Sequence, residues 1–204
     1  MHIAVLGGTG MVGSRIVSEA SGRGHRVTAV SRSGGSTDLD DVTELAADAG
    51  DPAVLRRLAA DHDVLVCATG PNRTPGADHS PYLDLVKNLI TETPPARLFV
   101  VGGAGSLFVG PDQLLVDSPQ FPPEYREESL TGLAALNLLR ASRDVEWTYL
   151  SPAPVIAPGR RSGSYTVGDD NPVGDSITAE DFAVAVLDEL ENPTHPRRRF
   201  TVAA

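Results

Sequence analysis

The chain has 204 residues, of which 41% are hydrophobic and 22% charged, a composition typical of a globular domain with its own apolar core. Its formal net charge is −10, from 27 acidic and 17 basic residues, so phosphate backbones and anionic lipids are repelled. We therefore expect neither nucleic acid nor a membrane as a partner. The single cysteine, Cys67, excludes an internal disulfide, and its apolar neighbours predict a buried core thiol.

Further classes of function are disfavoured by short segments. The histidines share no ligand spacing, so no metal site is expected. The N-terminus begins a strand without a leader pattern, and no apolar stretch could span a bilayer, so we expect a cytoplasmic protein. Residues 197–199, three arginines, are expected in a solvated turn before the last strand. The expected partner is a small-molecule substrate, and both a monomer and a homodimer fit the sequence.

The first half of the chain alternates short apolar runs with helical ones, which is typical of a parallel sheet flanked by helices. The expected strands cover residues 2–7, 25–32, 41–48 and 63–70. The expected helices cover residues 10–24, 51–61 and 81–93. Asp51 and Pro52 are the expected N-cap and first residue of the second helix.

The second half continues the alternation. Its expected strands are residues 97–105, 145–153 and 198–203, and its expected helices are residues 122–142 and 178–192. Thr178 begins the last helix in a capping-box pattern with Asp181. Together these elements predict a single α/β domain over residues 1–204, a Rossmann-like doubly wound parallel sheet between helices in three layers.

Two segments, residues 102–123 and 152–178, fit neither period and are rich in Gly, Pro and Ser. We call them the first and the second loop. Both follow the carboxyl ends of expected strands, where open α/β sheets bind ligands. We therefore predict that these two loops form the walls of a substrate site.

A glycine turn, residues 7–13 ("GGTGMVG"), lies directly between the first strand and the first helix. Its three spaced glycines suit a tight turn, a close backbone approach to a diphosphate and close packing of helix on sheet. The helix start adds free N–H groups and the positive end of its dipole. The turn therefore predicts a dinucleotide site. The residues expected to bind there are Gly7, Thr9, Gly10, Met11, Val12 and Gly13.

The end of the second strand bears on which dinucleotide binds. Ser31 and Arg32 stand there, with no acidic residue before Asp38. A carboxylate at this place would bind the ribose 2′-hydroxyl, whereas an arginine suits a 2′-phosphate. We therefore predict NADP(H) as the preferred cofactor. NAD stays possible, because an arginine after a strand is also a common surface residue.

The adenosine end of the site is predicted from the next two strands. Asp48, at the end of the third strand, can bind the exocyclic amine of adenine, with the Ala49 backbone beside it; the alternative is a plain loop carboxylate. The residues expected beneath the adenosine ribose are Ala68, Thr69 and Gly70.

A family resemblance rests on several stretches: "GGTGMVG", the Asp48 corner, "VVGGAGSL", "TYLSPAPVIAPG", and "SYTVGDD" followed by "TAEDFAVAVLDELENP". Together they resemble the atypical short-chain dehydrogenase/reductase group. Within it, the chain is most similar to small NAD(P)-dependent epimerase-like or NmrA-like members near biliverdin reductase B and flavin reductase. The resemblance covers nearly the whole chain, and it implies a nicotinamide end near the tips of the fifth and sixth strands.

The resemblance also implies roles for individual residues. Residues 102–106, including Gly102 and Gly103, would line the nicotinamide side. Within them Ser106 would donate a hydrogen bond to substrate or carboxamide, unless it is a plain turn serine. Asn88 would bond backbone and support the sheet. The backbone expected at the nicotinamide ribose and carboxamide is that of Pro152, Ala153 and Val155.

The chain departs from this group at the proton-transfer pair. Active members carry Tyr-x-x-x-Lys, in which the lysine lowers the pKa of the tyrosine. Aligning the helix by its "LLR" ending puts Glu128 and Gly132 at those two positions. Tyr125 lies one turn earlier, and four residues on stands Ser129, not a lysine. Tyr125 is a second candidate for substrate contact, against a packed or capping role.

Three functions follow from these features. The first is an NADPH-dependent oxidoreductase that reduces a flavin, a quinone or a similar conjugated acceptor without a Tyr/Lys pair. The second is a regulator of NmrA-like type that senses NAD(P) without turnover. The third is an NAD-dependent epimerase-like enzyme, which normally needs the missing pair and a larger substrate domain.

Overall fold

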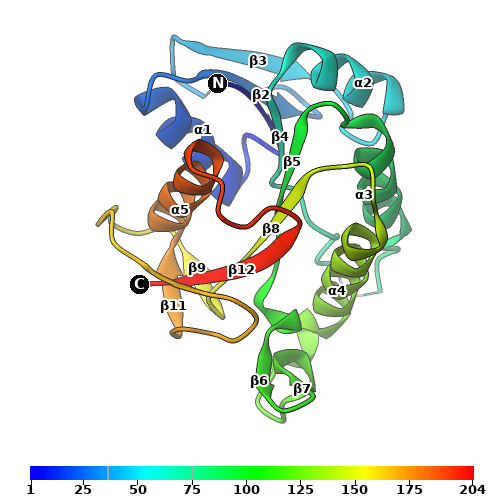
Figure 1. Cartoon of the computed structure of the whole chain (residues 1–204), viewed down its shortest axis with the longest axis vertical. Coiled ribbons are helices and arrows are strands. Elements are labelled where there is room, and N and C mark those ends of the chain that lie inside the picture. Colours follow the sequence, from blue (N-terminus) through cyan, green and yellow to red (C-terminus); the bar gives the residue numbers. More distant parts are fainter. Residues whose placement is uncertain (36, 75) are drawn as a thin grey trace.

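The computed structural model describes residues 1–35, 37–74 and 76–204, and an eight-stranded sheet forms its centre (Figure 1). From edge to edge the strands are β10 (Thr166–Gly168), β12 (Arg198–Ala203), β8 (Trp147–Pro152), β5 (Arg97–Val101), β4 (Val64–Cys67), β1 (His2–Leu6), β2 (Arg26–Ser31) and β3 (Val42–Ala46). Only β10 is antiparallel to its neighbour.

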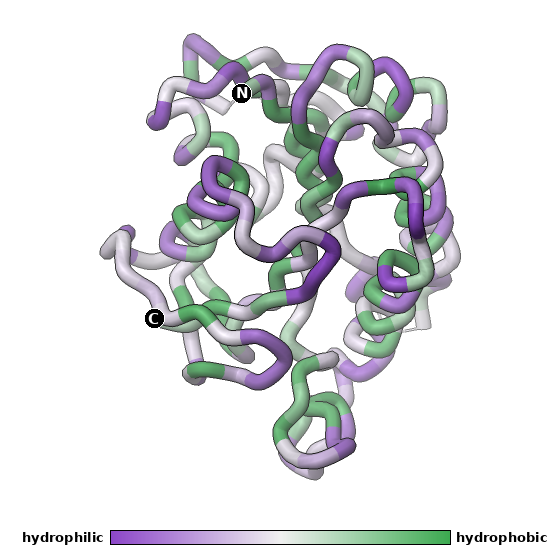
Figure 2. Tube along the Cα trace, in the orientation of Figure 1, coloured by the Kyte–Doolittle hydropathy of each residue, from purple (hydrophilic) through white to green (hydrophobic). Residues whose placement is uncertain are grey.

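The central strands are apolar because side chains on both faces are buried. In β1, Ile3 and Val5 enter one apolar core, and Ala4 and Leu6 enter the other, each with no exposed surface. Figure 2 shows hydrophobic residues along the central strands and hydrophobic stretches in the helices. Cys67 and Trp147 lie in the second core, as predicted.

Five α-helices cover the sheet within the described residues. α1 (Met11–Gly22) and α5 (Ala179–Glu191) lie on one face, and α2 (Pro52–Asp61), α3 (Ser80–Glu92) and α4 (Arg126–Ala141) lie on the other (Figure 1). The strand order reverses between β1 and β4. The predicted Rossmann-like, doubly wound arrangement in three layers is therefore confirmed, with its switch point beside β1.

The two loops contain short strands that the sequence did not predict. In the first loop, β6 (Phe108–Gly110) and β7 (Gln113–Leu114) form a hairpin. In the second, β9 (Val155–Ala157) pairs with β11 (Ser176–Thr178). Strands of two or three residues show no hydropathy period, which is why sequence patterns miss them. The expected strand over residues 97–105 ends at Val101, and the expected helix over residues 122–142 begins at Arg126.

Helix caps show where a local prediction holds and where it fails. The Asp51 carboxylate accepts a 2.8 Å hydrogen bond from the Ala53 amide, as predicted for an N-cap. Thr178 Oγ1 accepts one from the Asp181 amide at 3.0 Å. The Asp181 carboxylate, however, accepts bonds from the amides of Ser162 and Gly163, both at 2.8 Å. The second half of the capping box is therefore replaced by a tertiary contact.

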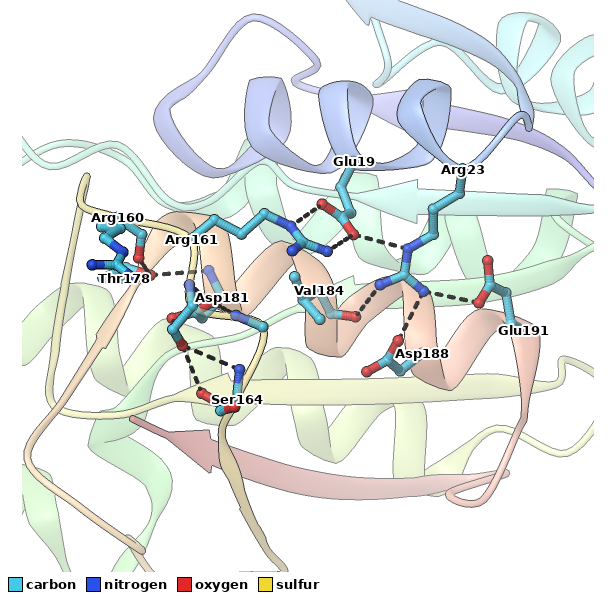
Figure 3. A network of polar contacts seen from close by, with 12 residues as sticks. Glu19, Arg23, Arg160, Arg161, Ser164, Thr178, Asp181, Val184, Asp188 and Glu191 are labelled. Atoms are coloured by element: carbon cyan, nitrogen blue, oxygen red, sulfur yellow. Dashed lines mark hydrogen bonds and ion pairs between the residues drawn. The ribbon is translucent and has the colours of Figure 1, made fainter.

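A polar network fastens the second loop to helices α1 and α5 (Figure 3). Arg161 of the loop pairs with Glu19 of α1 at 2.8 Å. Glu19 also accepts from Arg23, which binds Asp188 and Glu191 of α5 at 2.8 Å each. The loop that follows β9 is thus held to the helix that begins at the glycine turn.

Arg199 lies in the strand predicted over residues 198–203, but it departs from the expectation that all three arginines are solvated. Arg197 and Arg198 are exposed, but Arg199 lies within β12 and only 5% of its surface is exposed. Its Nε donates a 2.6 Å hydrogen bond to Asp170, from the turn after β10. The expectation was wrong because the buried partners of Arg199 are distant in sequence. Within the described part of the chain, no helix is both long and apolar enough to cross a membrane.

Candidate functional site

The carboxyl ends of β3, β2, β1, β4, β5 and β8 lie side by side along one edge of the sheet. Backbone bonds continue past the strand ends: the Gly7 amide donates to Val30 O at 2.9 Å, and the Gly102 amide donates to Leu150 O at 2.8 Å. The residues predicted to bind the dinucleotide, which follow these strands, therefore lie along one edge of the sheet.

Gly7 and Gly13 of the glycine turn leave no room for a Cβ. Gly7 has φ +81°, and a Cβ there would lie 3.0 Å from the Ala68 carbonyl oxygen. A Cβ on Gly13 would lie 2.0 Å from the carbonyl oxygen of Gly7, well inside contact distance. α1 therefore begins in direct contact with the turn, as the spacing predicts.

The start of α1 is suited to an anion. Gly10 is its N-cap and provides no side-chain hydrogen bond, and the first turn contains no acidic residue. The amides of Met11, Val12 and Gly13 consequently have no intrahelical acceptor. Such N–H groups, together with the helix dipole, favour a phosphate. The residues present therefore fit the diphosphate of a dinucleotide.

The segment after β2 lies close to the glycine turn. Ser31 ends β2 and is partly buried, whereas the Arg32 side chain is exposed. Gly35 packs against Thr9, where an added Cβ would lie 3.1 Å from Thr9 Cγ2. Sequence patterns do not predict this contact, which brings the segment that follows Arg32 close to the glycine turn.

The predicted adenine corner is an ordered turn. The Gly50 amide donates to Asp48 Oδ1 at 2.9 Å, and Asp48 stays exposed beside the partly buried Ala49. Asn88 of α3 donates to the Gly50 carbonyl at 3.1 Å, which confirms its backbone-bonding role. On the other side of the turn, a Cβ on Gly7 would lie 2.9 Å from the side chain of Thr69, between Ala68 and the exposed Gly70.

On the predicted nicotinamide side, Ser106 has a specific hydrogen-bond partner. Its side chain is buried, and its Oγ accepts a hydrogen bond from Arg199 Nη1 at 3.2 Å. The Ser106 side chain can still donate its hydroxyl hydrogen. Gly103 is exposed and Gly102 partly so. Across the edge, Pro152 and Ala153 are buried, while Val155 is 58% exposed.

The helix that would carry a Tyr/Lys pair has neither residue in place. Glu128 forms an ion pair with Arg73 at 3.0 Å. The Gly132 carbonyl accepts a 3.3 Å hydrogen bond from the hydroxyl of Tyr149. Tyr125 is the N-cap of α4 and is 48% exposed, which leaves it open to contact with a substrate.

The pKa shifts near this edge do not favour proton transfer at neutral pH. Burial raises the pKa of the Cys67 thiol. Burial likewise raises the pKa of Tyr149 to about 12. Neither group loses a proton readily at pH 7. Among the residues that the structure describes, no group of three or more His, Cys, Asp or Glu side chains could hold a metal.

The first and second loops meet beyond the sheet edge. The Phe108 amide donates to Asp170 O, and Asn171 Nδ2 donates to Phe108 O, both at 2.8 Å. An open cavity of about 740 Å³ lies between the β6–β7 hairpin and residues 171–172. Its lining comes from both predicted wall segments, although no residue of the glycine turn takes part.

Comparisons with known proteins agree with this geometry. The sequence profile of the NAD(P)H-binding family matches residues 7–193. The uncharacterized protein YwnB of Bacillus subtilis (strain 168) is 39% identical, over 100% of this chain and 99% of that protein. A crystal structure from Burkholderia pseudomallei, named as an inferred exported protein, shares 38% identity and a TM-score of 0.88, covering 100% of both chains.

A further crystal structure, SP1627 from Streptococcus pneumoniae TIGR4, carries the name of an inferred NADH-flavin reductase. It is 27% identical to this chain, with a TM-score of 0.86 and coverage of 100% of this chain and 99% of that one.

Proposed function

The chain belongs to the NAD(P)H-binding family of the atypical short-chain dehydrogenase/reductase type, and on that premise we propose that it is an NADPH-dependent reductase of a flavin, a quinone or a similar flat conjugated acceptor. When bound, NADPH supplies a hydride to the acceptor and leaves as NADP+, while the proton that completes the reduction comes from water. One observation carries the proposal: the chain has a glycine turn with free amides at the start of α1, while its α4 lacks a Tyr/Lys pair.

The choice of acceptor follows from what the described side chains can do. Carbonyl reduction needs a proton donor at the carbonyl oxygen, and neither Glu128 nor Gly132 is one. A conjugated ring system needs chiefly stacking and proximity. Exposed apolar side chains at the ligand edge, Met11 and Val155, suit a flat apolar acceptor. SP1627, whose name gives a flavin as acceptor, supports the same choice.

NADP(H) is proposed as the preferred dinucleotide because of Arg32. Its exposed guanidinium follows β2, where a 2′-phosphate would lie, and a guanidinium binds a phosphate with charge-assisted hydrogen bonds. The predicted adenine contact of Asp48 and the predicted substrate contacts of Ser106 and Tyr125 belong to the same proposal. So do a cytoplasmic location, a small-molecule partner, and a monomeric or homodimeric state.

Stopped-flow oxidation of NADPH with FMN, menadione and dichlorophenolindophenol tests this function. We expect turnover with at least one of the three acceptors. Glu128→Gln is the matched control: it keeps the size of the side chain that replaces the family tyrosine, and the rate should stay within about twofold because that position transfers no proton. No oxidation with any acceptor would exclude the reductase.

A regulator that binds NAD(P) without turnover is the second candidate, favoured by the same missing pair on α4. It predicts dinucleotide binding, no hydride transfer, and a protein partner whose affinity differs between NADP+ and NADPH. The epimerase ranks last, because it needs both the pair and a larger substrate domain.

A further inference from the structure

Tyr149 and Arg199 form a buried polar pair beneath the nicotinamide side of the site. They stand opposite each other in the parallel register of β8 and β12, so both side chains lie on the sheet face that α4 covers. Tyr149 is 1% exposed and Arg199 is 5% exposed. Both side chains form hydrogen bonds, while the buried Nη2 of Arg199 forms an ion pair with Asp170 in place of a hydrogen bond.

Tyr149 supports the first half of the segment of residues 102–106. A Cβ on Gly102 would lie 2.0 Å from Cε1 of its ring, so the backbone of Gly102 rests directly on the tyrosine. The hydroxyl donates to the Gly132 carbonyl at 3.3 Å. The same hydroxyl accepts from the backbone of Gly103. Tyr149 therefore links this segment to the turn of α4 where family members carry a lysine.

Arg199 supports the second half. Its Nη1 donates to the carbonyl oxygen of Ser106 at 3.0 Å and to Ser106 Oγ at 3.2 Å. Its Nε is held by Asp170 at 2.6 Å. A buried guanidinium in planar, fixed contact with three acceptors has little freedom to move. The position of Ser106 thus depends on an anchor from the last strand.

We propose that Tyr149 and Arg199 are positioning residues, which hold the backbone of residues 102–106 in the position that contacts the nicotinamide ring. They act through Gly103 and Ser106 and do not touch the dinucleotide themselves. The inference rests on the proposed function where the rate of hydride transfer is measured. Where the fluorescence of bound NADPH is measured, it requires only that the dinucleotide binds.

The pair supports only one end of the site. The glycine turn and the adenine corner belong to β1, β2 and β3, on the other side of β4 and β5. Loss of the pair should therefore leave the diphosphate and adenine contacts intact while the nicotinamide end loosens. Displacements of about 1 Å at a reacting centre can lower a rate by about a hundredfold. We therefore expect a large fall in the rate of hydride transfer and a small change in the dissociation constant for NADPH.

Tyr149→Phe is the decisive variant, because the ring keeps its contact with Gly102 and only the hydroxyl is removed. Thr148→Val is the matched control. It removes one buried hydroxyl from the same strand, one that donates to His195 O at 3.1 Å, on the opposite face of the sheet. Arg199→Lys is the second variant, since lysine keeps the charge but lacks the planar fork that binds Ser106 and Asp170 together.

Each protein is titrated with NADPH, and the emission of the bound nicotinamide is recorded along with the single-turnover rate at saturating NADPH. For Tyr149→Phe and Arg199→Lys we expect a dissociation constant within about threefold of the unmodified protein, a changed nicotinamide emission, and a hydride-transfer rate lower by about tenfold or more. Thr148→Val should match the unmodified protein in all three.

Unchanged emission and rate in Tyr149→Phe would overturn the inference, as would equal losses in Tyr149→Phe and Thr148→Val. If the unmodified protein binds NADPH but reduces no acceptor, the reductase proposal fails on its own, and the emission comparison still decides whether the pair positions the nicotinamide.

Discussion

Gly13 is the residue whose replacement the glycine turn should tolerate least. A Cβ there would lie 2.0 Å from the Gly7 carbonyl, so α1 would have to move away from the turn that it packs against. For Gly13→Ala we expect the NADPH dissociation constant to rise about tenfold or more, measured by calorimetry, because the free amides of α1 leave their places.

Gly22→Ala is the control for that variant. Gly22 ends the same helix, and a Cβ there would meet nothing within 4 Å. Alanine is favoured over glycine in helices by up to about 1 kcal/mol, so this variant should be equally or more stable and bind NADPH normally. If both alanine variants lost affinity alike, the close approach at Gly13 would not be what the site needs.

Arg32 should separate the two dinucleotides. For Arg32→Ala, we expect NADPH affinity to fall by about tenfold or more, because hydrogen bonds to a charged group contribute about 1.5–3 kcal/mol. NADH has no 2′-phosphate, so its affinity should change by less than about twofold. Fluorescence titration with both dinucleotides measures this, and an equal fall for NADPH and NADH would contradict the role of Arg32.

At the scale of elements, the helix caps show which structure is local. Asp51 and Thr178 cap their helices as the sequence predicts, because each bond spans only two or three residues. The predicted capping-box role of the Asp181 carboxylate is not found, because this carboxylate binds Ser162 and Gly163, which only the tertiary fold brings near. The pairing of β9 with β11 was missed for the same reason, since the two strands are distant in sequence. The β6–β7 hairpin is local, and it was missed because its strands are too short to show a hydropathy period.

Asp181→Asn should loosen the second loop. Asparagine loses the charge that strengthens the hydrogen bonds from the amides of Ser162 and Gly163, and its NH2 group replaces the oxygen that accepts from Ser162 Oγ. We therefore expect a loss of about 2 kcal/mol in the free energy of unfolding at neutral pH. Urea unfolding measures it. A loss below about 0.5 kcal/mol would mean that this carboxylate contributes little to holding the loop.

The same substitution should flatten the acid side of the stability curve. Burial raises the pKa of Asp181, but hydrogen bonds from Gly163 and Ser162 outweigh it and lower the pKa below its ordinary value. A carboxyl of this kind stabilises the fold above its unfolded pKa of about 3.9, and the contribution is lost as pH falls through the lowered folded pKa. Asp181→Asn lacks this contribution, and an unchanged acid slope would contradict it.

At the scale of the whole molecule, the alternation of strands and helices, the three-layer class of fold and the glycine turn were predictable from hydropathy period and glycine spacing. The support beneath the site was not. Tyr149 lies in an apolar run that predicts an ordinary core residue, and Arg199 lies in a basic run that predicts a solvated turn. Their roles depend on the neighbouring positions of β8 and β12, which are about fifty residues apart in sequence.

His62 should make the stability of the whole fold sensitive to mild acid. Burial lowers the pKa of His62, whose Nδ1 donates to Leu58 O while Thr28 donates to Nε2, a pattern that suits the neutral ring. The unfolded chain then takes up a proton first, near pH 6.5, so the free energy of unfolding falls as pH drops below that value.

His62→Gln keeps polar groups in place without the titration. Between about pH 7.5 and about pH 5.5, the unmodified protein should lose more stability than this variant in urea unfolding. Identical losses would show that His62 has no lowered pKa in the folded state.

The central claim is that the glycine turn and the first amides of α1 bind the diphosphate of a dinucleotide. Titration calorimetry of the purified protein with NADPH and NADH tests it directly. We predict one dinucleotide bound per chain, NADPH more tightly than NADH, and weaker binding of both by Gly13→Ala. If neither dinucleotide gave any heat of binding, the claim would be contradicted, and the reductase and the sensor proposals would both fail.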